Sequence, residues 1–122
     1  MMHEVELERH AQVPLIFTGE LIAEVSTEED GNDRWEEWRV WRLEPNSKVG
    51  WVVQRLGKSR VPGEVDVIHT FKCKYPIDVR NRLHRQDPRD KERWYMTDSA
   101  FETLEQAAAA DERLAFTLTE RI

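Results

Sequence analysis

The sequence contains a single cysteine, Cys73, among its 122 residues. One thiol excludes an internal disulfide and a cysteine-rich metal site. Long apolar runs are also lacking, since no stretch approaches the roughly 18 consecutive apolar residues of a membrane span. The first ten residues are acidic and do not resemble a signal peptide. These absences predict a cytoplasmic protein that does not bind a membrane, and we expect neither a metal site nor a cofactor.

Hydrophobic residues make up 39% of the chain, which is too many for a disordered protein. Charged residues make up 34%, so the core must be compact and the surface heavily charged. A chain of this length has enough residues for one core. We therefore expect a single domain over residues 1–122, and we leave open a flexible acidic N-terminus over residues 1–12.

The periodicity of the apolar residues predicts an α+β fold. Four segments alternate as strands do and are separated by turn residues; they are 13–27, 35–43, 49–56 and 65–75. Pro76 begins a predicted short helix that reaches about His84, and a capping box at 99–102 begins a second helix. Residues 93–96 suit a short fifth strand, and 113–122 fit either a helix or a strand, with helix favoured.

These segments predict a four- to five-stranded antiparallel meander sheet with C-terminal helices packed on one face. So few helices can cover only one face of such a sheet. The other face is then left to water or to a partner.

Tryptophan is abundant, with five residues, and a core of this size buries two or three of them. The others should lie on a contact surface, where tryptophan is enriched. Four candidates lie on the predicted sheet: Trp35, Trp38, Trp41 and Trp51. Our first hypothesis is a non-enzymatic binding or regulatory protein. It would act through protein–protein contact at the open sheet face, with a protein partner or in a homodimer.

The charge is unevenly spread along the chain. Residues 1–30 contain eight acidic residues and one basic residue, whereas residues 72–93 contain eight basic and four acidic residues. The candidate binding residues of the basic stretch are Lys72, Lys74, Arg82, Arg85, Arg89 and Arg93. Flanking aromatic residues, such as Trp94, can stack on bases. The alternative function is nucleic-acid or nucleotide binding, although a pI near 5.3 disfavours non-specific binding.

The acidic segments also suggest a surface that mimics nucleic-acid phosphates, as in inhibitors of bacterial immunity encoded by phages or mobile elements. A second alternative is a small hydrolase or transferase that uses Glu64, Asp66 or His69. On a regular strand Asp66 and His69 face opposite sides, and His69 and Cys73 lie about 13 Å apart, too far for one metal ion. The sequence therefore assigns no catalytic or metal-binding residue, and we lean against an enzyme.

Three segments resemble the uncharacterised actinobacterial EXLDI-type proteins. They are Phe17-Thr18-Gly19-Glu20-Leu21-Ile22-Ala23-Glu24, Arg39-Val40-Trp41-Arg42 and Gly50-Trp51-Val52-Val53. These segments are hairpin-like. The resemblance implies a bacterial or phage origin and, because that family has no established activity, no particular function.

Overall fold

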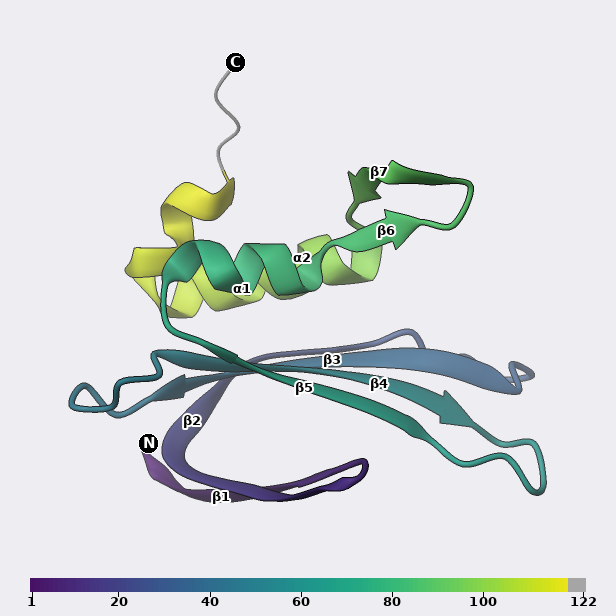
Figure 1. The fold of residues 1–122 in the computed structure, drawn as a ribbon, viewed down its shortest axis with the longest axis horizontal. Coiled ribbons are helices and arrows are strands. Elements are labelled where there is room, and N and C mark those ends of the chain that lie inside the picture. The colour runs from purple at the N-terminus through teal and green to yellow at the C-terminus, as the bar shows by residue number, and fades with distance from the viewer. Residues whose placement is uncertain (119–122) are drawn as a thin grey trace.

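The computed structural model describes residues 1–118 and places a curled antiparallel sheet beneath two helices (Figure 1). The sheet has five strands in the order β1-β2-β3-β4-β5, and a separate two-stranded sheet is formed by β6 and β7. The strands of the main sheet are β1 (His3–Arg9), β2 (Gln12–Ser26), β3 (Arg34–Leu43), β4 (Trp51–Ser59) and β5 (Val67–Cys73). The remaining elements are α1 (Pro76–Leu83), β6 (Arg85–Asp87), β7 (Asp90–Tyr95), α2 (Asp98–Ala110) and the 3-10 helix η1 (Glu112–Leu118). The predicted α+β meander with C-terminal helices is confirmed.

The upper core lies between the sheet and the helices. Alternate residues of β3 and β4, including Trp38 and Val53, point from the sheet toward the helices. Leu83 of α1 and Leu104 of α2 pack against them, and all four side chains are almost completely buried. The helices thus pack on one face of the sheet, as the sequence predicted.

Strand β2 bends, and this bend distinguishes the structure from a flat meander. Its first half pairs with β1 and its second half with β3, with a register shift between Leu21 and Ala23. Gly19 lies at the bend, where an added Cβ would stand 2.6 Å from the carbonyl oxygen of Arg42. Only glycine permits so close an approach between the two backbones. The β1–β2 hairpin can therefore fold beneath the sheet (Figure 1).

The lower core fills the space between this hairpin and the second face of the sheet. Trp41, Leu43 and Val52 project from the sheet, and Leu7 and Phe17 of the hairpin pack against them. The rings of Phe17 and Trp41 meet edge to face with their centroids 6.0 Å apart. The expectation of an open second face is therefore wrong, because the β1–β2 hairpin covers part of this face. Residues 3–9, for which a flexible N-terminus was left open, form strand β1 of that hairpin.

Most of the tryptophans proposed for a contact surface lie inside the protein. Trp38 and Trp51 belong to the upper core and Trp41 to the lower core, with exposed fractions of 0%, 2% and 6%. Trp35 is half-buried, and its Nε1 donates to Glu37 Oε2 at 2.8 Å. The number of buried tryptophans, three, agrees with the two or three expected, but these three candidates do not lie on a contact surface.

The C-terminal third differs from the prediction in its details. The strand predicted at 93–96 corresponds to the end of β7, which pairs with β6 in a hairpin outside the main sheet. Helix α2 is capped by Thr97, whose hydroxyl accepts from the Ala100 N–H, and not by Ser99. The helix favoured for 113–122 is a 3-10 helix to Leu118, and the last four residues lie outside those described. Neither α-helix of the described chain is long and apolar enough to cross a membrane.

Candidate functional site

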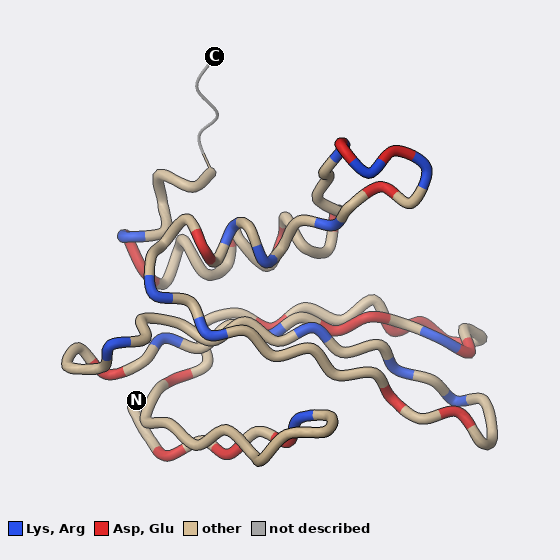
Figure 2. Tube along the Cα trace, viewed as in Figure 1, with Lys and Arg blue, Asp and Glu red and all other residues tan. Residues whose placement is uncertain are grey.

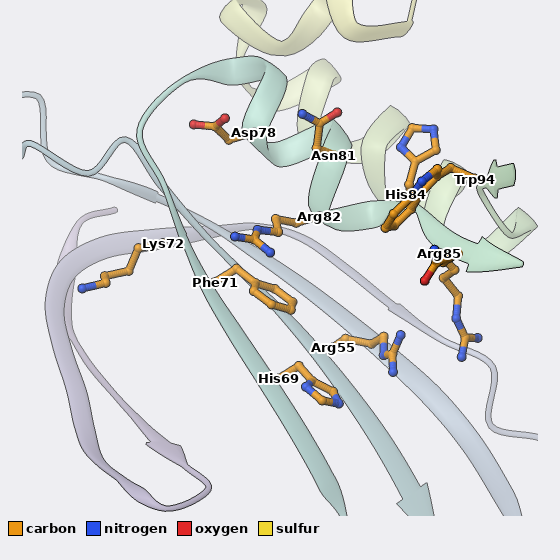
Figure 3. Close-up of a pocket in the computed structure, with 11 residues that line it drawn as sticks. Arg55, His69, Phe71, Lys72, Asp78, Asn81, Arg82, His84, Arg85 and Trp94 are labelled. Carbon is orange, nitrogen blue, oxygen red and sulfur yellow. The ribbon is translucent and has the colours of Figure 1, made fainter. Parts of the chain in front are cut away.

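A cleft of about 1040 Å³ opens where the helices stop covering the sheet (Figure 3). Its floor comes from β4 and β5, one wall from α1, and the other from the β6–β7 hairpin. The lining residues are Arg55, His69, Phe71, Lys72, Asp78, Asn81, Arg82, His84, Arg85, Gln86 and Trp94. This cleft brings together residues that are up to 39 positions apart in the sequence.

The strand register explains the polar floor of the cleft. Arg55 of β4 pairs with His69 of β5, and Val53 pairs with Phe71, so these four side chains share the helix-facing side of the sheet. Val53 lies under the helices in the upper core. Two residues further along β4, the helices no longer cover the strand, and the same alternation places the half-buried Arg55 in the cleft.

Arg82 reaches from α1 to the aromatic floor. Its guanidinium carbon lies 4.6 Å from the centroid of the Phe71 ring. The His69 ring is nearly parallel to the same Phe71 ring, with 6.3 Å between the two centroids. A guanidinium that stacks through its face keeps the N–H groups at its edge free to donate. No carboxylate in residues 1–118 forms an ion pair with Arg82, so these donors remain available to a ligand.

Two further arginines lie near the carboxylate of Glu36, and one of them, Arg85, pairs with it. Arg85 Nη1 donates to Glu36 Oε2 at 3.3 Å, and the other oxygen, Glu36 Oε1, is buried without a hydrogen-bond partner. Burial and then the charge of Arg85 lower the pKa of the Arg55 guanidinium, while Glu36 opposes the shift. Two cations beside one anion leave a net positive charge in the cleft.

The arginines of β3 are arranged differently. Arg34, Arg39 and Arg42 each form an ion pair with a glutamate, whereas Arg55 of β4 forms none within the described chain. Among residues 1–118, the one acid in the cleft lining is Asp78, whose Oδ2 accepts from the Tyr75 backbone N–H at 2.9 Å at the start of α1. The Asp78 carboxylate thus caps the start of α1. The cleft is positively charged although the protein has a net charge of −6.

His69 reports on the electrostatics of the cleft. Desolvation of its ring lowers its pKa below 6.5, and the neighbouring charges of Arg55 and His10 lower it further. Replacing Arg55 by glutamine should raise the pKa of His69 toward 6.5, because one of the repelling cations is removed. An NMR titration of the histidine ring resonances measures this shift. A pKa of His69 that does not move in Arg55→Gln would contradict the proximity of the two charges.

The basic residues predicted from the sequence divide into two groups. Arg82 and Arg85 line the cleft, and Lys72 lies at its rim with its side chain pointing away from the other lining residues (Figure 3). Lys74, Arg89 and Arg93 do not line the cleft. The hairpin that contains Arg89 and Arg93 carries bases and acids in close succession (Figure 2).

Several lining residues were not among the predicted binding residues. Arg55, Phe71 and His84 are examples, and Trp94 was predicted only as a stacking group that flanks the basic stretch. The sequence contains one signal for Arg55. This charged residue follows Trp51 and Val53 in the alternation of the strand, at a position where an apolar residue is expected. Its meeting with α1 depends on tertiary packing and leaves no local signal.

Of the groups considered for catalysis or metal binding, His69 lines the cleft, whereas Cys73, Glu64 and Asp66 do not. Burial raises the pKa of the Cys73 thiol to about 12, so it is protonated at neutral pH. Glu64 and Asp66 pair with Arg34 and Lys58, and the hydrogen bonds from these bases lower the pKa of both carboxyls. Within the described residues no three histidine, cysteine, aspartate or glutamate side chains gather to hold a metal ion. The side chains that line the cleft are mainly basic and aromatic.

Comparison with known proteins gives no relative. No family model matches the chain, and neither curated proteins nor solved structures give a match. The fold and the cleft define the protein as an α+β domain with a basic, aromatic-lined cleft.

Proposed function

We propose that this protein binds a nucleotide or nucleic acid through its phosphate groups in the basic cleft. The observation that carries the proposal is the convergence of Arg55, Arg82 and Arg85 on a cleft that also contains Phe71 and Trp94. Phosphate oxygens would accept from the guanidinium groups, which suit bidentate contacts to anions. A base would stack on an aromatic side chain.

The size and the exposure of the cleft agree with this proposal. Small-molecule sites commonly have volumes of roughly 300–1,000 Å³, and this cleft has about 1040 Å³. Trp94 is 59% exposed on the wall of the cleft, so its indole ring is accessible to a base. The proposal is one of binding and assigns no chemical step to the site.

Protein–protein contact through an open sheet face has less support. It depended on exposed tryptophans, and three of the four candidates are buried in the two cores. The β1–β2 hairpin covers part of the face in question. The nucleotide or nucleic-acid function, in contrast, uses a cavity and charges that are present on the surface.

Fluorescence anisotropy with a labelled ATP analogue and a labelled short oligonucleotide tests the proposal. Arg82→Glu should weaken binding of both by about tenfold or more, because a hydrogen bond to a charged group contributes roughly 1.5–3 kcal/mol. Binding to wild-type protein should also weaken as salt is added. Arg82 is exposed, so circular dichroism should show an unchanged fold.

Arg89→Glu is the matched control, since it makes the same charge change in the same basic stretch but outside the cleft lining. We expect it to retain most of the wild-type affinity. Equal losses in the two variants would mean that the charge of the segment matters and not the cleft. If the wild-type protein binds neither ligand at low salt, the proposal is wrong.

A further inference from the structure

A second, smaller cavity adjoins the basic cleft. It has a volume of about 280 Å³ and lies between β5 and the turn of the β1–β2 hairpin. Its lining residues are Arg9, His10, Gln12, Ile68, His69, Thr70 and Phe71. His69 and Phe71 line both cavities, so the two spaces meet at these side chains.

The path between the cavities crosses the edge of the sheet. In the part of the chain that the structure describes, strand β5 pairs only with β4 and is thus an edge strand of the main sheet. Ile68 and Thr70 alternate with His69 and Phe71 along it, so the smaller cavity is lined by residues from both faces of the strand. An edge strand presents backbone N–H and C=O groups that no neighbouring strand occupies.

The hairpin turn is fixed close to this edge. His10 Nε2 lies 2.9 Å from the carbonyl oxygen of Asp66, just before β5, and Arg9 Nε donates to the Val13 carbonyl at 3.0 Å. The charge of His10 contributes to the lowered pKa of His69, which agrees with their proximity. Arg9 and His10 thus extend the basic lining from the cleft to the other side of β5.

We propose that the ligand is a single-stranded nucleic acid whose chain runs from the cleft across the edge of β5 into the smaller cavity. This inference rests on the proposed function and specifies its ligand. A mononucleotide would occupy the cleft alone and would not contact the basic residues Arg9 and His10 of the smaller cavity. A longer strand can place successive phosphates near Arg82, Arg55 and Arg9 and stack unpaired bases on the aromatic side chains between them.

A duplex fits this arrangement less well. Its bases stack on one another and are not free to stack on Phe71, His69 or Trp94. Single strands engage such aromatic platforms with little dependence on sequence, over sites of about 4–16 nucleotides. We therefore expect affinity to grow with the length of a single strand until both cavities are filled.

Anisotropy measurements with the labelled ATP analogue and labelled oligothymidylates of about four and about twelve nucleotides test the inference. Wild-type protein should bind the longer strand more tightly than the shorter strand and the ATP analogue. His10→Glu should weaken binding of the longer strand by about fivefold or more through charge repulsion. It should leave the affinity for the ATP analogue unchanged, because that ligand lies in the cleft.

His3→Glu is the matched control. His3 is an exposed histidine on the same hairpin that lines neither cavity, and its substitution should change no affinity. Arg9→Gln provides a second variant without added negative charge and should also weaken binding of the longer strand selectively. Backbone NMR spectra report whether each variant keeps the hairpin in place.

The possible results separate this inference from the proposed function. If affinity does not depend on strand length and His10→Glu changes no affinity, the ligand stays in the cleft and the inference is overturned, while the proposed function stands. Equal weakening of the ATP analogue by His10→Glu, or equal binding of a duplex, would also overturn it. If Arg82→Glu weakens none of the ligands, the proposed function itself fails.

Discussion

Replacing Trp41 by alanine should lower the free energy of unfolding by about 3–5 kcal/mol, the usual cost of removing a large aromatic side chain from a core. Trp41 is 6% exposed and packs with Leu43 and Val52 in the lower core. Its ring meets the edge of Phe17 from the β1–β2 hairpin. The substitution therefore removes the contact that holds the hairpin beneath the sheet. Urea denaturation followed by circular dichroism measures the loss.

Trp35→Ala is the control for this prediction. Trp35 lies on the same strand but is half-buried and packs under the guanidinium of Arg60, so its loss should cost clearly less. A double-mutant cycle with Trp41→Ala and Phe17→Ala gives a sharper result, since the stability losses from substitutions at two residues in contact do not add. Additive losses would mean that the hairpin does not depend on this contact, contrary to the structure.

Local patterns in the sequence predict most of the main sheet. Alternation of apolar and polar residues locates β2 to β5, and Pro76 marks the first residue of α1. Strand β1 carries the same alternation, since Val5 and Leu7 are half-buried between exposed glutamates. The acidity of the segment obscured that signal and favoured a flexible terminus.

The folding of the hairpin beneath the sheet has no such local signal. It depends on the close approach of Gly19 to the backbone of β3, which only the paired strands reveal. Without this bend the second face of the sheet would be open, as the sequence suggested. The burial of Trp41 follows from the bend and could not be predicted from β3 alone.

The candidate site was predictable only in part. Arg82 and Arg85 stand out because they belong to a basic stretch. Arg55 and His69 join them through the register of β4 and β5 and through the position of α1 above the sheet. Charge density along the chain therefore locates one wall of the cleft, and the tertiary structure supplies its floor.

A second large loss of stability is expected when the contacts of Asp111 and Arg113 with Trp51 of the sheet are removed. Trp51 Nε1 donates to Asp111 Oδ2 at 3.1 Å, and Arg113 Nε and Nη2 donate to the same carboxylate at 3.0 and 2.7 Å. The side chain of Asp111 is 3% exposed. The Arg113 guanidinium also lies 4.6 Å above the Trp51 ring. These contacts connect the residues after α2 to the upper core.

Asp111→Ala should lower the free energy of unfolding by about 1–3 kcal/mol, because it leaves the buried indole N–H of Trp51 without an acceptor. Asp111→Asn should cost less, since its amide oxygen still accepts from the indole. Urea denaturation of the wild-type protein and both variants measures these differences. An alanine variant as stable as the wild type would mean that water replaces the carboxylate at the indole.

The pH dependence of the free energy of unfolding shows how much the negative charge of Asp111 contributes, because Asp111→Asn keeps the shape of the side chain but removes its charge. Burial raises the pKa of this carboxyl, but the hydrogen bonds from Arg113 and Trp51 outweigh that effect and hold the pKa below its ordinary value of 3.8. The stabilisation by the carboxylate is thus complete above about pH 4 and is lost as the pH falls through the folded-state pKa. The stability gap between wild type and Asp111→Asn should therefore be constant above about pH 4 and narrow below it. A gap that stays unchanged in acid would show that the ionised carboxylate contributes nothing beyond its hydrogen bonds.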